Sequence, residues 1–273
     1  MISKKLQNLF NKKKIVIGVV HLRPLPGSPS YEGESVENIY DFALKDTESY
    51  LKGGIDGIIV ENHGDIPFSK PDNMGPETVS IMSVIANKLN EKFKKITFGI
   101  NVLANDAISA IAVAKASNAS FIRVNQYANA YVANEGLIEG QAAKITRYRK
   151  WLNADSVSIF ADVHVKHGAH AIVADRSITE LAKDCEFFNA DALIATGNRT
   201  GDGATSDEVA EIKKATSLPV LIGSGVNQEN LDSYYSLCDG FIVASSLKFD
   251  GLWQNPVEYE RVKSFVRSLN LLS

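Results

Sequence analysis

Residues 55–60 read IDGIIV, and the same pattern returns as ASFIRV at 119–124, ADALIA at 190–195 and CDGFIV at 238–243. Each copy follows a helical stretch, passes a small residue and usually an aspartate, and then runs into a short apolar strand. That order is typical of the joint between a helix and a strand that is buried on both faces. The repetition predicts an α/β protein with a (β/α)8 TIM barrel, a fold that carries its chemistry at the C-terminal ends of the strands.

Length and composition favour a single domain. The chain has 273 residues, of which 45% are apolar, enough for one barrel over 14–273 preceded by an N-terminal helix within 1–13. The net charge is −3, no basic block points to nucleic acid, and no apolar run is long enough to form a transmembrane segment. Cys185 and Cys238 lack metal-ligand spacing and are interpreted as buried thiols of a cytoplasmic protein. A homo-oligomer is compatible with this composition.

Eight short apolar runs are expected to form the barrel. They lie at 15–21, 57–61, 96–101, 121–125, 157–164, 192–196, 219–223 and 240–244. The connections that follow the first two runs, at 23–35 and 63–75, are longer than usual, and long loops on this face usually close over a ligand. Proline at a first helical position predicts helix starts at Pro76 and Pro256.

Polar side chains appear only at the last positions of these runs. Because side chains alternate across a strand, residue parity predicts that they point into the mouth of the barrel. The predicted ring consists of His21, Glu61, His63, Asn101, Arg123, Asn125, Asp162, His164 and Thr196. Charges at the mouth of a dry barrel are costly unless they are paired or used, so the ring as a whole predicts a functional site.

Roles within the ring follow from residue chemistry. Asp162 and Glu61 are the expected general acid and base, with His164 or His21 as partners, because burial shifts the pKa values of such groups toward neutral pH. Arg123 is the expected anchor for an oxyanion or sugar oxygen. The remaining substrate-binding candidates are Asn125, Asn101, His63 and Thr196.

A phosphate signature follows the last two strands. Gly223-Ser224-Gly225 and Ser245-Ser246 stand where (β/α)8 enzymes commonly hold phosphate with backbone N–H groups. We therefore expect these five residues to bind the phosphate of a small-molecule substrate. Gly201-Asp202-Gly203 is the candidate for a flap over the same place, with a solvated turn as its alternative.

No cofactor is expected, and a divalent metal is the alternative. The residues that could hold such an ion are Glu61, His63, Asp162 and His164. Their spacing matches no recognised metal motif, which is why acid/base chemistry without a metal is preferred.

Three segments together carry a family resemblance: GVVHLRPLPGSP at 18–29, VENHGDIPF at 60–68 and ADVHVKH at 161–167. With ATG at 195–197 and GSGV at 223–226, the chain resembles the BtpA/SgcQ family over about residues 14–250. The resemblance implies a barrel related to the phosphate-binding barrels. It also implies two kinds of role, because the family is named after a cyanobacterial factor needed to accumulate photosystem I, while other members are associated with sugar metabolism.

Two hypotheses follow. The first is an enzyme that acts on a phosphorylated sugar or nucleotide-like metabolite by acid/base chemistry, as an isomerase, a lyase or a glycosidic hydrolase. The second is a non-catalytic assembly or stability factor for a membrane protein complex such as photosystem I.

Overall fold

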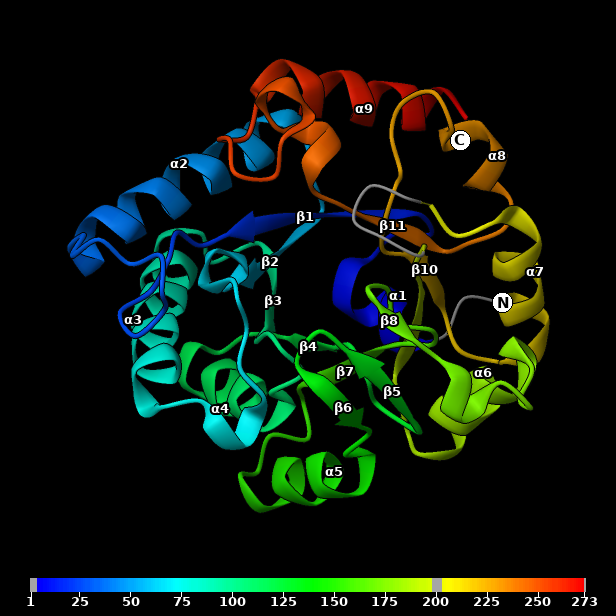
Figure 1. Ribbon diagram of the computed structural model, residues 1–273. Helices are drawn as coiled ribbons and strands as arrows, with labels where there is room; N and C mark the ends of the chain where they lie inside the picture. Colours follow the sequence, from blue (N-terminus) through cyan, green and yellow to red (C-terminus); the bar gives the residue numbers. More distant parts are fainter. Residues whose placement is uncertain (1–3, 198–202, 273) are drawn as a thin grey trace.

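The computed structural model describes residues 4–197 and 203–272, and within them eight parallel strands close into a barrel in sequence order (Figure 1). The predicted fold is confirmed. The barrel strands are β1 (Ile15–His21), β2 (Gly57–Glu61), β3 (Thr97–Asn101), β4 (Phe121–Val124), β7 (Ser158–Asp162), β9 (Ala192–Ala195), β10 (Val220–Ile222) and β11 (Gly240–Val243). Several of these strands are one to three residues shorter than expected, mostly at their C-terminal ends.

Helices surround the barrel on its outer side (Figure 1). They are α2 (Val36–Gly53), α3 (Pro76–Lys92), α4 (Ala107–Ser117), α5 (Ala142–Trp151), α6 (Ile178–Phe187), α7 (Ser206–Ala215), α8 (Leu231–Tyr235) and α9 (Tyr259–Leu271). The start at Pro76 is as predicted. The last helix begins at Tyr259 instead of Pro256, because Val257 pairs in an antiparallel bridge with Lys248 and keeps that segment extended. None of the helices within the described ranges is both long and apolar enough to cross a membrane.

The barrel interior is dry and apolar below its mouth. Ile15, Ile17 and Val19 alternate along β1 and face inward, where Phe121 and Phe160 stack with ring centroids 4.5 Å apart. The first helix, α1 (Lys4–Phe10), places Leu6 in this same cluster and Phe10 against Phe121. Because α1 packs at the N-terminal ends of the strands, the open end of the barrel is the C-terminal one.

The repeated aspartates have a structural role at the joints between helices and strands. Each carboxylate accepts a hydrogen bond from a backbone N–H near the start of the neighbouring strand. The bonds run from Val16 to Asp56 at 2.9 Å, from Ile159 to Asp191 at 2.9 Å and from Val220 to Asp239 at 2.8 Å. A basic side chain also pairs with each carboxylate: Lys12, Arg149 and Lys213 respectively. These bonds fix how adjacent parallel strands align.

A small antiparallel sheet that the sequence patterns did not predict lies across the mouth of the barrel near β4 and β7 (Figure 1). It consists of β5 (Ala130–Ala133), β6 (Gly136–Glu139) and β8 (Gly168–Ala169). The hairpin turn ends at Gly136, whose φ of 97° is readily adopted only by glycine. This sheet adds a cap over one side of the opening.

We predict that Asp191→Ala lowers the free energy of unfolding by ~2 kcal/mol, because it leaves the buried N–H of Ile159 without an acceptor and removes the carboxylate that pairs with Arg149. Urea denaturation measures this loss. Asp155→Ala is the matched control, since Asp155 forms an exposed ion pair with Lys150, and it should cost less than ~0.5 kcal/mol. Equal losses in the two variants would contradict the role given to the joint aspartate.

Candidate functional site

The mouth of the barrel contains two neighbouring cavities that share part of their lining. A cavity of about 340 Å³, the anion lobe, is lined by residues 223–227, 244–246 and Arg261. A second cavity of about 370 Å³, the cap lobe, lies under the small sheet and is lined by Phe68, Tyr131 and Trp253 among others. Both cavities are lined by the same four polar residues, Glu61, His63, Arg123 and Lys166. These four therefore form the junction between the lobes.

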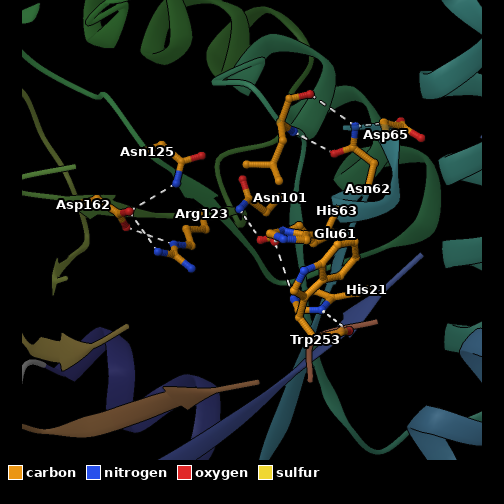
Figure 2. A network of polar contacts seen from close by, with 11 residues as sticks. His21, Glu61, Asn62, His63, Asp65, Asn101, Arg123, Asn125, Asp162 and Trp253 are labelled. Atoms are coloured by element: carbon orange, nitrogen blue, oxygen red, sulfur yellow. Dashed lines mark hydrogen bonds and ion pairs between the residues drawn. The ribbon is translucent and has the colours of Figure 1, made fainter. Parts of the chain in front are cut away.

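Strand register brings the first polar cluster together. His21 of β1 pairs in register with Glu61 of β2, and Glu61 pairs in register with Asn101 of β3. Figure 2 shows their side chains meeting around the Glu61 carboxylate. Asn101 donates from Nδ2 to Oε2 of Glu61 at 2.6 Å, while Oε1 lies 3.0 Å from Nδ1 of His63 and 3.7 Å from Nε2 of His21.

These contacts decide the charges in the cluster. Burial alone would raise the pKa of Glu61, but the hydrogen bond from His63, followed by electrostatic interactions with His63, His21 and Arg123, holds it well below its usual range. Burial lowers the pKa of His21, and the charges of Lys248 and His63 lower it further. The cluster therefore contains the ionised carboxylate of Glu61 beside the neutral imidazole of His21.

A loop that follows the last strand completes the cluster. The backbone oxygen of Trp253 lies 3.2 Å from Nδ1 of His21, and the Trp253 ring meets the His63 ring edge-on with centroids 4.5 Å apart (Figure 2). Asp46 of α2 holds both ends of this loop: its carboxylate accepts from the N–H of Val257 at 2.8 Å and lies 3.5 Å from Nζ of Lys248.

The turn that carries His63 is braced from behind. Asn62 donates to Asp65 at 3.0 Å and accepts from the N–H of Leu103 at 2.7 Å, while Asp65 accepts from the N–H of Leu25 at 2.8 Å. This bracing ties the loops after β1, β2 and β3 to one another. His63 consequently has a fixed place at the junction.

The second polar cluster is a buried ion pair. Asp162 of β7 binds Arg123 of β4 through both oxygens, at 3.0 Å to Nε and 2.9 Å to Nη2, and accepts from Asn125 at 3.2 Å (Figure 2). Asp162 lies behind Arg123 and lines neither lobe. The geometry therefore favours a positioning role for Asp162 over the expected proton transfer. Asn125 keeps its buried Oδ1 without a partner among the described residues, as an acceptor at the cap lobe.

The five residues expected to bind phosphate lie together in the structure. Gly223, Ser224, Gly225, Ser245 and Ser246 all line the anion lobe. Gly225 has a φ of 67°, and Ser246 donates to the backbone oxygen of Val226 at 2.8 Å, which joins the two loops. The loops that follow two neighbouring strands thus form one concave surface.

Two expected ring members do not join the site. The chain leaves the barrel after Asp162, so the alternation predicted through residue 164 stops, and His164 packs on His170 with ring centroids 3.7 Å apart. Thr196 is buried and donates to the backbone oxygen of His164 at 2.6 Å, which makes it a connector of loops. In the candidate flap, residues 201 and 202 lie outside the described residues.

A divalent ion could be held by a different set from the one expected. Among the described residues, His21, Glu61 and His63 place their ligand atoms within 4.8 Å of one another. Asp162 is engaged by Arg123, and His164 lies with His170, so neither joins this set. In this set the His21 and His63 rings stack, and Glu61 accepts a hydrogen bond from His63.

Sequence reasoning assigned no role to Lys166, Trp253 and Tyr131, which line the site. Lys166 lies within the 161–167 segment that carries the family resemblance, so its signal was present in the sequence. Trp253 lies in a loop and Tyr131 in the short strand β5, neither of which has a recognisable sequence pattern, and only the folded structure brings them to the mouth.

Comparison with known proteins agrees with this architecture. The family model described as "BtpA family" matches residues 12–271. The chain belongs to the BtpA family. A BtpA-family relative from Archaeoglobus fulgidus is 44% identical over 94% of this chain and 98% of its own length. Another, the photosystem I biogenesis protein BtpA of Synechocystis, is 38% identical over 95% of this chain and 89% of its own length.

Solved structures show the fold that this BtpA-family chain shares. The tryptophan synthase alpha chain of Legionella pneumophila superposes with a TM-score of 0.63 at 12% identity, covering 99% of this chain and 97% of that one. At such identity the similarity concerns the barrel alone.

The position of His164 outside the site has a measurable consequence. Burial, followed by the charge of His170, lowers the pKa of His164 to about 4, below the ~6.5 of an unfolded histidine. Since the unfolded state binds more protons between these values, we predict that the free energy of unfolding falls as pH drops from about 6.5 to about 4.

Urea denaturation across this pH range tests the prediction with His164→Gln as the comparison. The variant should lose less stability than the wild type over the same interval, because glutamine does not titrate. Identical slopes for both proteins would contradict the placement of His164.

Proposed function

We propose that this BtpA-family protein is an enzyme that binds a phosphorylated small molecule and moves protons on it. The observation that supports the proposal is the shared lining of the two lobes. A phosphate bound by the loops at 223–227 and 244–246 would place the rest of the molecule over Glu61, His63 and Arg123. The substrate class is a phosphorylated sugar or nucleotide-like metabolite.

His63 is the proposed general base. A hydrogen bond donated by Nδ1 to the Glu61 carboxylate puts the proton of a neutral imidazole on Nδ1 and leaves Nε2 as the acceptor. Asn101 holds the other carboxylate oxygen, so Glu61 orients the imidazole and stabilises its charged form after proton uptake. This arrangement gives Glu61 and His63 different duties in one proton transfer.

Arg123 and His21 are the proposed binding partners for ligand oxygens and N–H groups. Asp162 occupies Nε and Nη2 of Arg123 and leaves its other N–H groups for a ligand oxygen. His21, held through Nδ1 by the backbone of Trp253, presents Nε2 as an acceptor. Both assignments fit a polar ligand that extends from the anion lobe.

The alternative function is that of a non-catalytic factor in the assembly of a membrane protein complex. The name of the Synechocystis relative is the observation that favours it. Under this alternative, Glu61→Gln leaves partner binding intact and surface substitutions abolish it. The cytoplasmic location and a homo-oligomeric state remain predictions.

Phosphate binding predicts a thermal shift. Phosphorylated sugars at 100-fold excess over Kd should stabilise the fold by ~2.7 kcal/mol, a rise of several degrees in Tm, and their unphosphorylated counterparts should not. Ser245→Asp should remove this rise because it brings a negative charge into the anion lobe. The control Ser80→Asp, on the exposed face of α3, should keep it. Equal shifts with and without the phosphate group contradict the assignment of the anion lobe.

Proton transfer predicts isotope exchange. Phosphorylated aldoses and ketoses incubated with the protein in D2O should exchange carbon-bound hydrogen next to the carbonyl group, as followed by NMR. His63→Gln and Glu61→Gln should each slow the exchange by ~10²-fold or more. His164→Gln is the control, because His164 lines neither lobe, and it should exchange at the wild-type rate. Exchange that survives in both site variants would rule out this base.

A further inference from the structure

Lys166 occupies the junction without a role in the mechanism above. It follows β7 by four residues and lies between Val165, which is buried against Tyr131 and Ile138, and His167, which has a φ of 65°. Its half-buried side chain lines both the anion lobe and the cap lobe. A ligand that spans the two lobes would pass directly over this amine.

The carboxylates near Lys166 already accept hydrogen bonds from other side chains. Glu61 and Asp162 are the acidic groups whose charges act on the amine. Glu61 accepts from His63 and Asn101, and Asp162 is held by both nitrogens of Arg123. Within residues 4–197 and 203–272, no carboxylate oxygen lies within ion-pair distance of Nζ of Lys166.

A second buried lysine, Lys248, differs from Lys166 because it has a carboxylate partner. Lys248 is fully buried, but it lies 3.5 Å from the Asp46 carboxylate and holds the loop that carries Trp253. Lys248 is therefore structural. Burial, followed by the charge of the Arg123 guanidinium, lowers the pKa of Lys166, and the charges of Glu61 and Asp162 only partly oppose this shift. The lowered pKa increases the fraction of the uncharged amine, which is the nucleophilic form.

We propose that Lys166 forms an imine with the carbonyl carbon of a phosphorylated aldehyde or ketone held in the anion lobe. This inference rests on the proposed function, because the phosphate would place the carbonyl group at the junction. It narrows the substrate class to phosphorylated carbonyl compounds, which include open-chain sugar phosphates.

The step is a balanced condensation. The Lys166 nitrogen attacks the carbonyl carbon and forms a C–N bond, while one amine proton transfers to the carbonyl oxygen. The hydroxyl group then leaves with the second amine proton as one molecule of water, and a C=N bond remains. His63 lines the same cavity and is available to carry these protons. Hydrolysis reverses the condensation and releases the amine.

Reductive trapping tests the proposal on the full chain. The protein is incubated at pH 7 with D-glyceraldehyde 3-phosphate and sodium cyanoborohydride, which reduces the imine to a stable secondary amine, and the modified lysines are mapped by mass spectrometry. We expect Lys166 to be modified at least tenfold faster than Lys150, an exposed lysine paired with Asp155. Inorganic phosphate should slow modification of Lys166 only, and glyceraldehyde without phosphate should lose the preference.

The variants Lys166→Arg and Lys150→Arg distinguish a failure of imine formation from a failure of phosphate binding. Lys166→Arg keeps the positive charge, so phosphate should still raise its Tm, but fast modification should disappear; Lys150→Arg should keep both. Modification of Lys166 no faster than that of Lys150, with the phosphate-dependent Tm shift intact, overturns the imine and leaves the proposed function standing. Loss of the Tm shift in the wild type as well overturns the proposed function itself.

Discussion

A carboxylate that accepts the N–H of the neighbouring strand limits how far two parallel strands can slide past each other. In this chain Asp56, Asp191 and Asp239 impose that limit between β2 and β1, β9 and β7, and β11 and β10. A one-residue slip would send every side chain of a strand to the opposite face. The register set at the lower end of β1 and β2 is also what places His21 beside Glu61 at the upper end. The aspartate joints and the candidate site therefore depend on the same strand register.

The polar groups at the mouth are compensated in separate units. Arg123 and Asp162 neutralise each other through a bidentate contact, and the Glu61 carboxylate accepts hydrogen bonds from His63 and Asn101. Burial of an unpaired charge costs several kcal/mol, so such pairing lets the barrel keep ionised groups buried at its opening. Within residues 4–197 and 203–272, the amine of Lys166 has no carboxylate at ion-pair distance and the Oδ1 of Asn125 has no hydrogen-bond partner, so both differ from this pattern.

The sequence alone was sufficient to predict the barrel and to predict which side chains face its mouth for most of the polar ring. Strand parity placed Glu61 and Arg123 correctly because both lie inside regular strands, where alternation holds. It did not hold for His164, because β7 ends at Asp162 and Val163 pairs with β9 as the chain turns away. The small sheet and Trp253 could not be predicted, since short loop strands lack periodicity and the contact of Trp253 with His21 joins distant parts of the chain.

The loop at 248–257 adds a further consequence. One carboxylate, that of Asp46, fastens both of its ends to α2, while its middle carries Trp253 over the two histidines. Exposed residues such as Leu252 lie at the tip and make no contribution to that fastening. Substitutions at the tip therefore leave the two fastened ends unchanged, and Trp253 keeps its place over the histidines whatever side chain stands at position 252.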